Sequence, residues 1–486
     1  MPPKTDPEVG CVIPEHGEWP VDPQEDVEIR EERLWIDGCF DFFHHGHAGV
    51  MLQSRRLGNE LVVGLHGDEE IATNKGPTVM NLAERVAAVN ACRFSSKCVP
   101  HAPYVTSLPW ISHYGCQYVT HGDDITSDAS GNDCYRFVKK AGRMKIVPRT
   151  PGISTTDLVG RMLLCTKDHF IKSLTDSVEG KEGNGGEEER TARGKEMEKR
   201  IHEYAAAPNG KDPYVAIYTF KSKHRSPERR RSSVRRNSTS GSHDTGKGTF
   251  TPLVSGLAPR PGQRVVYVDG GFDLFSSGHI AFLQLVTALE QDLGRERGWY
   301  TDEARSKRLE EDGGEDYPPA YIVAGIHDDE VINYYKGINY PIMNIFERGL
   351  CAVQCRYIHA VVFGAPYTPT KTFLASLPAT ASNNSLPDAV YHGPTSFMPA
   401  TTATDPYADA KTSGIFQQTP DHDFQDVNAA QIVQRILDRR VDYEERQRKK
   451  GAKGVGEGAL RREEMEQEAE EERERRRGEV ERQFGA

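Results

Sequence analysis

The sequence predicts an α/β protein with two parallel-sheet domains in tandem. Three observations support this prediction: the chain has 486 residues, its two halves repeat the same ordered motifs, and apolar runs alternate with segments of helical spacing in each half. A chain of this length can form two or three domains. Strands that alternate with helices are typical of a parallel sheet covered on both faces, and such sheets bind ligands at the carboxyl ends of their strands.

The internal repeat extends well beyond one short pattern. Its first motif reads Ile36-Asp-Gly-Cys-Phe-Asp-Phe-Phe-His-His-Gly-His47 and recurs as Val268-Asp-Gly-Gly-Phe-Asp-Leu-Phe-Ser-Ser-Gly-His279. Four more pairs follow in the same order: residues 64–71 with 325–332, Lys75-Gly76 with Lys336-Gly337, Glu84-Arg85 with Glu347-Arg348, and Ala102-Pro-Tyr104 with Ala365-Pro-Tyr367. Each half is therefore predicted to be one copy of the same fold.

Each copy begins with a predicted strand, a turn that contains glycine, and a helix. The opening strands are Leu34–Ile36 and Val265–Val268, and a helix with apolar residues at Val50, Leu52 and Leu57 follows the first of them. A second apolar run comes next in each copy, at Leu61–Val63 and Tyr321–Ala324. The repeated motifs fall where these strands end.

The rest of the chain divides by composition. Residues 1–30 form an N-terminal extension, the first domain covers 31–170 and the second covers 261–440. The second domain carries two insertions, at about 290–318 and 379–412. Residues 171–260 are rich in Gly, Ser, Glu, Lys and Arg, which predicts a disordered linker, and 441–486 predict an exposed, charged helical tail.

Composition also narrows the class of protein. A net charge of -11 argues against a general nucleic-acid binder. The sequence shows no run of about 18 apolar residues and no signal peptide, so we expect a soluble, cytoplasmic protein without a transmembrane segment. Its nine cysteines lack the spacing of a zinc site, and we expect free thiols.

A basic stretch in the predicted linker carries serines after arginine pairs. Ser233 and Ser238 follow Arg229-Arg-Arg and Arg235-Arg, an exposed context that a kinase could recognise. We hypothesise phosphorylation at one of them, where phosphate would cancel local positive charge. A solvated spacer is the alternative interpretation.

The most informative motif of the first copy is His44-His-Gly-His47. His44 and His47 are three positions apart and project to the same side of a first helical turn, and Gly46 lets a ligand approach the backbone closely. A helix N-terminus binds phosphate, and two added donors would stabilise charge that develops during displacement at phosphorus.

Three further segments supply groups that bind phosphate. Lys75 lies in a predicted mobile loop and could reach a phosphate as a flexible charge. The run His121-Gly-Asp-Asp124 sits where another strand ends, and Arg149-Thr-Pro-Gly-Ile-Ser-Thr-Thr156 enters a helix that Ser154, Thr155 and Thr156 can cap.

Together, HxGH, the loop lysine and RTxGISTT make residues 33–165 resemble the cytidylyltransferase branch of the HxGH nucleotidyltransferase superfamily. The resemblance implies Rossmann-like domains. The duplication is similar to the tandem members that act on ethanolamine phosphate, because the phosphocholine enzymes have one catalytic domain followed by a lipid-sensing helix. It implies transfer of CMP from CTP to phosphoethanolamine, giving CDP-ethanolamine and pyrophosphate for phospholipid synthesis.

The resemblance also implies roles for individual residues. His44 and His47 would contact the α-phosphate, Lys75 would bridge phosphates of both substrates, and Arg149 with Ser154 and Thr155 would hold the pyrophosphate end. The residues expected to line the nucleotide site are Gly38, Cys39, Phe40, Asp41, His121, Gly122, Asp123, Asp124, Thr150, Gly152, Ile153, Ser154 and Thr155. Mg²⁺ is expected with CTP, held largely by phosphates because the chain offers no metal cage.

The second copy departs from this pattern. Ser276 replaces the first histidine, His279 and Lys336 remain, His392-Gly is the counterpart of His121-Gly, and RTxGISTT is missing. We expect a non-catalytic copy that packs against the first and shapes or regulates it. Whether it binds nucleotide stays open.

Three alternatives remain at this point. A cytidylyltransferase for phosphocholine or glycerol phosphate is the nearest. An aminoacyl-tRNA synthetase with a HIGH motif would need a KMSKS-like loop and a basic RNA-binding face, and the sequence shows neither. A non-enzymatic nucleotide sensor suits the second copy better than the first. The chain is expected to be a monomer or a homodimer, with peripheral membrane contact open.

Overall fold

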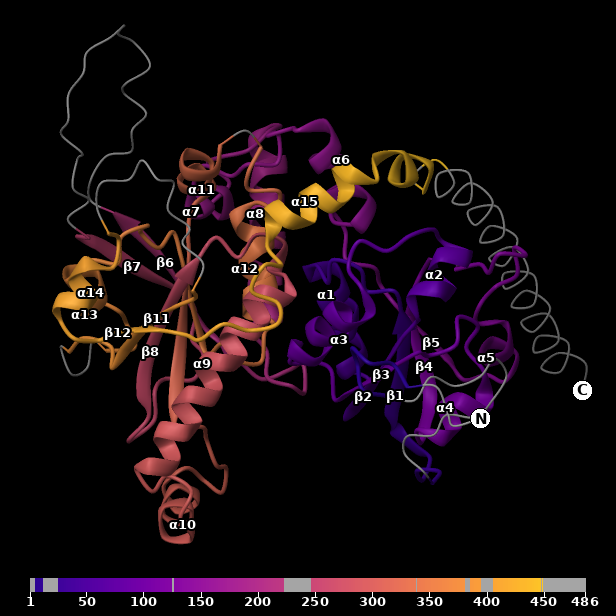
Figure 1. The fold of residues 1–486 in the computed structure, drawn as a ribbon, viewed down its shortest axis with the longest axis horizontal. Helices are drawn as coiled ribbons and strands as arrows, with labels where there is room; N and C mark the ends of the chain where they lie inside the picture. The colour runs from indigo at the N-terminus through magenta and orange to yellow at the C-terminus, as the bar shows by residue number, and fades with distance from the viewer. Residues whose placement is uncertain are drawn as a thin grey trace, which may run out of the picture.

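The computed structural model describes residues 5–11, 25–124, 126–222, 246–337, 339–380, 385–394, 405–446 and 448. Ser233 and Ser238, the hypothesised phosphorylation sites, lie outside these ranges, as does most of the predicted charged tail. Figure 1 shows two α/β domains side by side, with helices of both packed between their sheets.

The first domain is built on a five-stranded, fully parallel sheet in the order β3-β2-β1-β4-β5. Its central strands are buried over most of their length because helices cover both faces. The strands are β1 (Arg30–Gly38), β2 (Glu60–Leu65), β3 (Lys97–Pro100), β4 (Cys116–Gly122) and β5 (Met144–Val147). The helices are α1 (His45–Arg55), α2 (Asp68–Asn74), α3 (Leu82–Ala91), α4 (Leu108–His113), α5 (Arg136–Lys140) and α6 (Thr155–Leu164).

The second domain repeats this order and adds two strands at one edge. Its sheet runs β12-β11-β8-β9-β10-β6-β7, in which the first five strands match β5-β4-β1-β2-β3. The repeat elements are β8 (Arg264–Gly270), the 3₁₀ turn η2 (Asp273–Phe275), α9 (Ser277–Glu296), β9 (Ala320–Ile326), α11 (Asp329–Lys336), α12 (Ile345–Val353), β10 (Ala360–Phe363), α13 (Lys371–Ala375), β11 (Ala389–His392), α14 (Ala408–Thr412), β12 (Phe416–Gln418) and α15 (Ala429–Asp438). The tandem α/β prediction is confirmed.

The prediction of a disordered linker over 171–260 was wrong for its two ends. The structure forms α7 (Leu174–Val178), α8 (Glu187–Tyr204), β6 (Ala216–Ser222) and β7 (Gly248–Val254) there. Strand β6 pairs parallel with β10 and antiparallel with β7. Helix α8 is charged on average, yet Met197, Ile201 and Tyr204 form a buried stripe. Averaging over a charged stretch hides such a stripe, because three apolar residues at helical spacing suffice to dock a helix.

The two predicted insertions of the second domain contain regular elements. Helix α9 continues through Glu296, and α10 (Asp302–Glu311) follows it, projecting from the molecule at the bottom of Figure 1. Residues 379–412 contain α14 and β11, which pairs with β8. Strand β11 is only four residues long and is surrounded by Ser, Thr, Pro and Ala, so its apolar signal was too short to recognise.

Reciprocal contacts relate the two copies by a pseudo-two-fold axis. Helix α1 packs on α12 while α3 packs on α9, and α6 meets α15. The Arg93 N–H donates to the Gln354 carbonyl and the Arg356 N–H donates to the Ala91 carbonyl, both at 2.9 Å. Two equivalent ion pairs cross the interface: Arg161 binds Glu347, and Arg435 binds Glu84, each at 2.7 Å.

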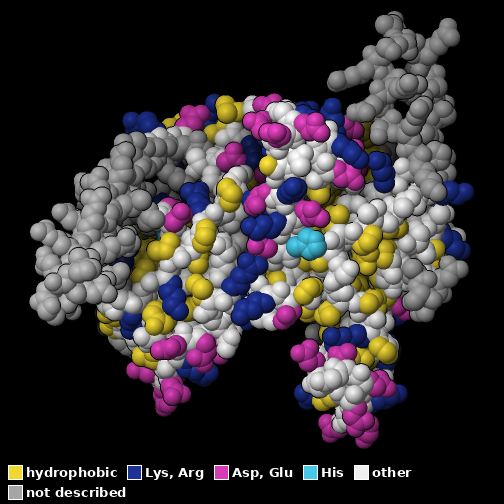
Figure 2. Space-filling view, turned by 180° about the vertical axis from the view of Figure 1, so that it is seen from behind, with side chains coloured by type: hydrophobic (Ala, Val, Ile, Leu, Met, Phe, Trp, Pro, Cys, Tyr) yellow, Lys and Arg dark blue, Asp and Glu magenta, His cyan; other side chains and the backbone are white. Residues whose placement is uncertain are grey.

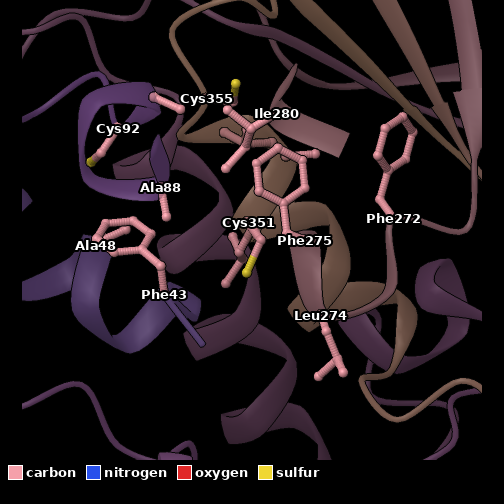
Figure 3. Packing of buried hydrophobic residues seen from close by; sticks show 14 of the residues in the cluster. Phe43, Ala48, Ala88, Cys92, Phe272, Leu274, Phe275, Ile280, Cys351 and Cys355 are labelled. Atoms are coloured by element: carbon pink, nitrogen blue, oxygen red, sulfur yellow. The ribbon is translucent and has the colours of Figure 1, made fainter. Parts of the chain in front are cut away.

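One hydrophobic core runs through both copies. Phe43, Ala88 and Cys92 of the first copy and Phe275 and Cys355 of the second belong to the same buried cluster, and Figure 3 shows them in one layer between the domains. Seen from behind in Figure 2, the two lobes join above and are separated by a notch below. The shared core makes the copies one structural unit, as the two halves of a homodimer are.

No helix among the residues placed by the structure is both long enough and apolar enough to cross a membrane.

Candidate active site

The turn after β1 has an unusual backbone. Phe40 and Phe42 adopt left-handed conformations with φ of 51° and 56°, which are costly for residues with a Cβ. The turn persists because both rings are buried and because Asp41 accepts hydrogen bonds from the Val79 and Met80 N–H groups at 3.1 and 3.0 Å. Such strain is often concentrated at functional sites. Here the strained turn leads directly into the N-terminus of α1.

The two histidines lie together at that N-terminus. His44 is the N-cap of α1, and its ring stacks on that of His47 with centroids 3.9 Å apart and planes 15° apart. The His47 ring also meets the edge of Phe40 at 5.4 Å. His44 is buried, and the helix has no acidic residue in its first turn that would neutralise its positive end. The arrangement is suited to an anion.

The RTxGISTT loop packs directly against this helix end. A Cβ at Gly46 would lie 2.8 Å from Ile153 Cγ2 and 2.9 Å from the His44 ring, so only glycine allows the approach. Gly152 adopts φ of 85° and turns the chain into α6, where Ser154 caps the helix by accepting from the Asp157 N–H at 3.0 Å. Thr155 Oγ1 donates to the Asp41 carbonyl at 3.3 Å. Two helix N-termini therefore converge on one place.

A residue from the supposed linker supports α1 from behind. The Tyr204 hydroxyl of α8 donates to the His45 carbonyl and contacts the Thr150 hydroxyl. A Cβ at Gly49 would lie 2.3 Å from the Tyr204 oxygen and 2.2 Å from Thr150 Oγ1, so glycine is required there too. Burial lowers the pKa of His45 to about 3, so this middle histidine is neutral and packs between the copies.

Lys75 and Arg149 approach from opposite sides of β1. Lys75 ends α2, which follows β2, and its ammonium lies 5.8 Å from the Tyr104 ring centroid. Arg149 follows β5 and lies 3.9 Å from Asp124 across an exposed pair whose side chains are each 54% accessible. Exposed pairs of this kind contribute little, so Arg149 can exchange Asp124 for a phosphate.

The structure reveals an acidic group that motif analysis overlooked. Asp37, at the carboxyl end of β1, is buried and accepts from Trp35 Nε1 and the Tyr135 hydroxyl, both at 2.7 Å, and from Thr106. The His121 ring lies 4.5 Å from Tyr135 and so joins this cluster. A signal was available, because Asp37 is part of the repeated Asp-Gly motif and matches Asp269.

The second copy uses the same residues differently. His279 Nδ1 accepts the Ser276 N–H at 3.1 Å and so caps its own helix, and burial lowers its pKa to about 3. The Ser276 hydroxyl donates to the Val427 carbonyl at 2.6 Å. Where the first copy admits Ile153 beside Gly46, a Cβ at Gly278 would lie 2.3 Å from the Val427 oxygen. This helix end is closed by its own chain.

The acidic cluster survives in the second copy. Asp269 Oδ1 accepts from the Tyr407 hydroxyl at 2.6 Å, as Asp37 does from Tyr135. Tyr367 takes the place of Tyr104 but stacks on Tyr335 at 3.9 Å, while Lys336 lies 5.6 Å from the Tyr340 ring. The second copy has therefore kept its carboxylate and lost the open histidine site.

Comparisons with known proteins agree with this geometry. A cytidylyltransferase-like family profile matches residues 35–161. The ethanolamine-phosphate cytidylyltransferase of Mus musculus is 37% identical over 426 residues, which cover 87% of this chain and 90% of that protein. That of Dictyostelium discoideum is 35% identical and covers 87% and 95%. The choline-phosphate cytidylyltransferase A of Homo sapiens is 38% identical, but over 32% of this chain and 43% of that protein.

Proposed function

The chain belongs to the family of ethanolamine-phosphate cytidylyltransferases, and from this premise we propose that it transfers CMP from CTP to phosphoethanolamine, releasing pyrophosphate and CDP-ethanolamine. The observation that carries the proposal is the stacked His44–His47 pair at the N-terminus of α1, beside the helix end that the RTxGISTT loop opens. The second copy lacks this open pair, so we assign the chemistry to the first.

The reaction is a displacement at the α-phosphorus of CTP. A phosphate oxygen of the acceptor forms the new P–O bond, and the bond to the pyrophosphate oxygen breaks. Little covalent work falls on the protein, so positioning and charge stabilisation supply most of the acceleration. His44 and His47 donate to oxygens of the α-phosphate as negative charge builds up there, and the positive N-terminal end of the helix also favours that charge.

The leaving group and the acceptor phosphate take the remaining cations. Arg149 with the N–H groups that follow Ser154 receives the pyrophosphate end, since a guanidinium and a helix N-terminus both favour phosphate. Lys75, on the other side of β1, reaches phosphates of both substrates as a flexible charge. The Gly38–Asp41 turn and the His121–Asp124 segment line the nucleotide.

Asp37 is the group best suited to the acceptor's ammonium. It is a buried carboxylate at the carboxyl end of β1, where ligands of parallel sheets bind. The rings of Tyr135 and His121 stand beside it, and aromatic faces attract a cation. A primary ammonium can donate hydrogen bonds to this cluster, whereas a trimethylated amine cannot, which favours phosphoethanolamine over phosphocholine.

Magnesium is proposed to arrive with CTP. Across the described ranges no three His, Cys, Asp or Glu side chains are placed to hold a metal ion. Asp41 is already bound by Val79, Met80 and Arg446. We propose an ion held largely by the triphosphate, which would neutralise phosphate charge when bound.

A direct assay tests the proposal. The purified chain is incubated with CTP, Mg²⁺ and either phosphoethanolamine or phosphocholine, and the CDP-alcohol is identified by mass. We expect CDP-ethanolamine with phosphoethanolamine and at least a tenfold lower kcat/KM with phosphocholine, about the effect of one lost charged hydrogen bond. Equal use of both acceptors would refute the assignment of the acceptor, and no product with either would refute the activity.

We further propose a cytoplasmic location, supported by nine cysteines that are all present as thiols. The internal pseudo-two-fold pairing supports a monomer as the functional unit, because it provides within one chain the interface that a dimer would form. A homodimer would appear as a doubled mass in gel filtration.

A further inference from the structure

The C-terminal end of the second copy reaches the active site of the first. After α15 the chain turns at Arg439 and continues as helical residues 440–446. In Figure 1 this yellow segment leaves the second domain, passes α6 and runs toward α2, the helix that ends at Lys75. A segment from one copy therefore covers the lysine loop of the other.

Arg435 of α15 and two side chains of this segment bind three successive carbonyls of the loop. Arg446 Nη1 donates to the Pro77 carbonyl at 2.6 Å, the Tyr443 hydroxyl donates to Thr78 at 3.0 Å, and Arg435 donates to Val79 at 3.3 Å. Tyr443 is 2% exposed, and the Arg446 side chain is 15% exposed. The loop is thus fixed along its whole outer side.

The inner side of the same loop is fixed by the strained turn. Asp41 accepts from the Val79 and Met80 N–H groups, and Arg446 Nη1 lies 3.4 Å from Asp41 Oδ2. The Arg446 stem packs over Gly76, where a Cβ would lie 3.3 Å from Arg446 Cγ. Arg446 therefore ties together the turn that leads to His44 and the loop that carries Lys75.

The contact breaks the pseudo-symmetry of the molecule. Arg161 and His169 of the first copy bind the Ile342 and Pro341 carbonyls of the second, at the same spacing at which Arg435 and Tyr443 bind Val79 and Thr78. By that spacing the counterpart of Arg446 is Lys172. Lys172 is exposed, and its backbone N–H is bound by Glu182 at 2.7 Å. Each copy thus binds two loop carbonyls of the other. The additional guanidinium, that of Arg446, binds only the loop of the first copy, which has the open histidine pair.

We propose that Arg446 is a positioning residue for CMP transfer, through which the second copy holds the 76–80 loop and places Lys75 for both substrates. The inference rests on the proposed function. It gives the degenerate copy a definite role, because that copy supplies part of the catalytic half from its C-terminal end. Arg446 acts through Lys75 and is not itself placed on the reacting phosphorus.

A double-mutant cycle on the full chain tests this role. With CTP and phosphoethanolamine, Arg446→Ala is expected to lower kcat/KM about tenfold, the effect of losing one charged hydrogen bond. In a Lys75→Ala background the same change should cost less than about twofold, because the group that Arg446 positions is gone. Arg446→Lys should recover part of the loss.

The matched control is Arg440→Ala. Arg440 lies on the same helical segment and forms an exposed pair with Glu444, with 59% of its side chain accessible, so we expect unchanged kinetics. Thermal unfolding is measured for every variant. A tenfold loss that persists in the Lys75→Ala background, or a fall in Tm with unchanged kcat/KM, would overturn the inference. An inactive wild-type chain would instead refute the proposed function, so the two failures are distinguishable.

Discussion

The two copies share one fold but differ in what their first helix does with its N-terminus. In the first copy His44 and His47 stack beside an open helix end. In the second copy His279 caps its own helix, and Ser276 binds the Val427 carbonyl. The His279 ring nitrogen and the Ser276 hydroxyl are therefore engaged within the second copy itself. We attribute the proposed loss of catalysis in the second copy to these changed hydrogen bonds, because the fold itself is kept.

The largest expected difference lies in the two histidine positions. His44→Ala or His47→Ala should lower kcat by about two to three powers of ten, the range for one preorganised transition-state donor. His279→Ala removes a cap in the second copy and should leave kcat within about threefold. Steady-state kinetics with CTP and phosphoethanolamine measure both, and an equal loss at His279 would show that the second site turns over.

The repeated strand–turn–helix units could be predicted because their signals are local. The motif ending in His47 and its copy ending in His279 showed that β1 corresponds to β8 and α1 to α9. The contribution of α8 could not be predicted in the same way. Its charged face dominates the composition of 187–204, and only the buried stripe ending at Tyr204 reveals that it docks behind α1.

The motif residues of the candidate site could be predicted from the sequence, but the residues that hold them in place could not. His44, Gly46 and the RTxGISTT loop were identifiable as residue patterns, and the structure brings them together. Arg446 carries no local signal, because its partner Pro77 is 369 residues away in the sequence. Contacts of that kind depend on how two domains pack, which residue spacing does not encode.

The second prediction concerns the two equivalent ion pairs across the interface between the copies. Arg161→Ala should destabilise the protein by about 2 kcal/mol, because the buried Glu347 carboxylate loses its guanidinium partner and retains the Asn344 N–H. Arg435→Ala should cost a similar amount through Glu84. Chemical denaturation measures both. If the interface is symmetric in energy as well as in geometry, the two losses agree within about 0.5 kcal/mol.

Kinetics of the same two variants sharpen the comparison between the copies. Arg435 also holds the Val79 carbonyl next to the lysine loop of the first copy, to which we assign the chemistry, so Arg435→Ala should lower kcat/KM about fivefold. Arg161 holds the corresponding loop of the second copy, so Arg161→Ala should lower it less than about twofold. A larger loss of kcat/KM for Arg161→Ala than for Arg435→Ala would indicate that the loop of the second copy, and not that of the first copy, limits turnover.

The smallest expected effect is a pH dependence that belongs to the second copy. Burial raises the pKa of Asp269 from 3.8 to about 7, with the hydroxyls of Tyr407 and Tyr267 opposing the shift. The folded state therefore binds this proton more tightly than the unfolded state, and the Asp269 contribution to stability falls as the pH rises from about 4 to about 7. Asp328, whose pKa burial also raises to about 7, acts in the same direction.

Asp269→Asn removes one of these two titrations. Relative to wild type, its Tm should rise by a few degrees more at pH 8 than at pH 5, since each kcal/mol corresponds to about 1 °C in a cooperative unit of this length. Differential scanning calorimetry at the two pH values measures the difference, with Asp302→Asn at the exposed start of α10 as the control. A pH-independent difference would mean that Asp269 stays ionised in the folded protein, and the second copy would then hold its carboxylate in the same state over the whole range instead of losing stability as it ionises.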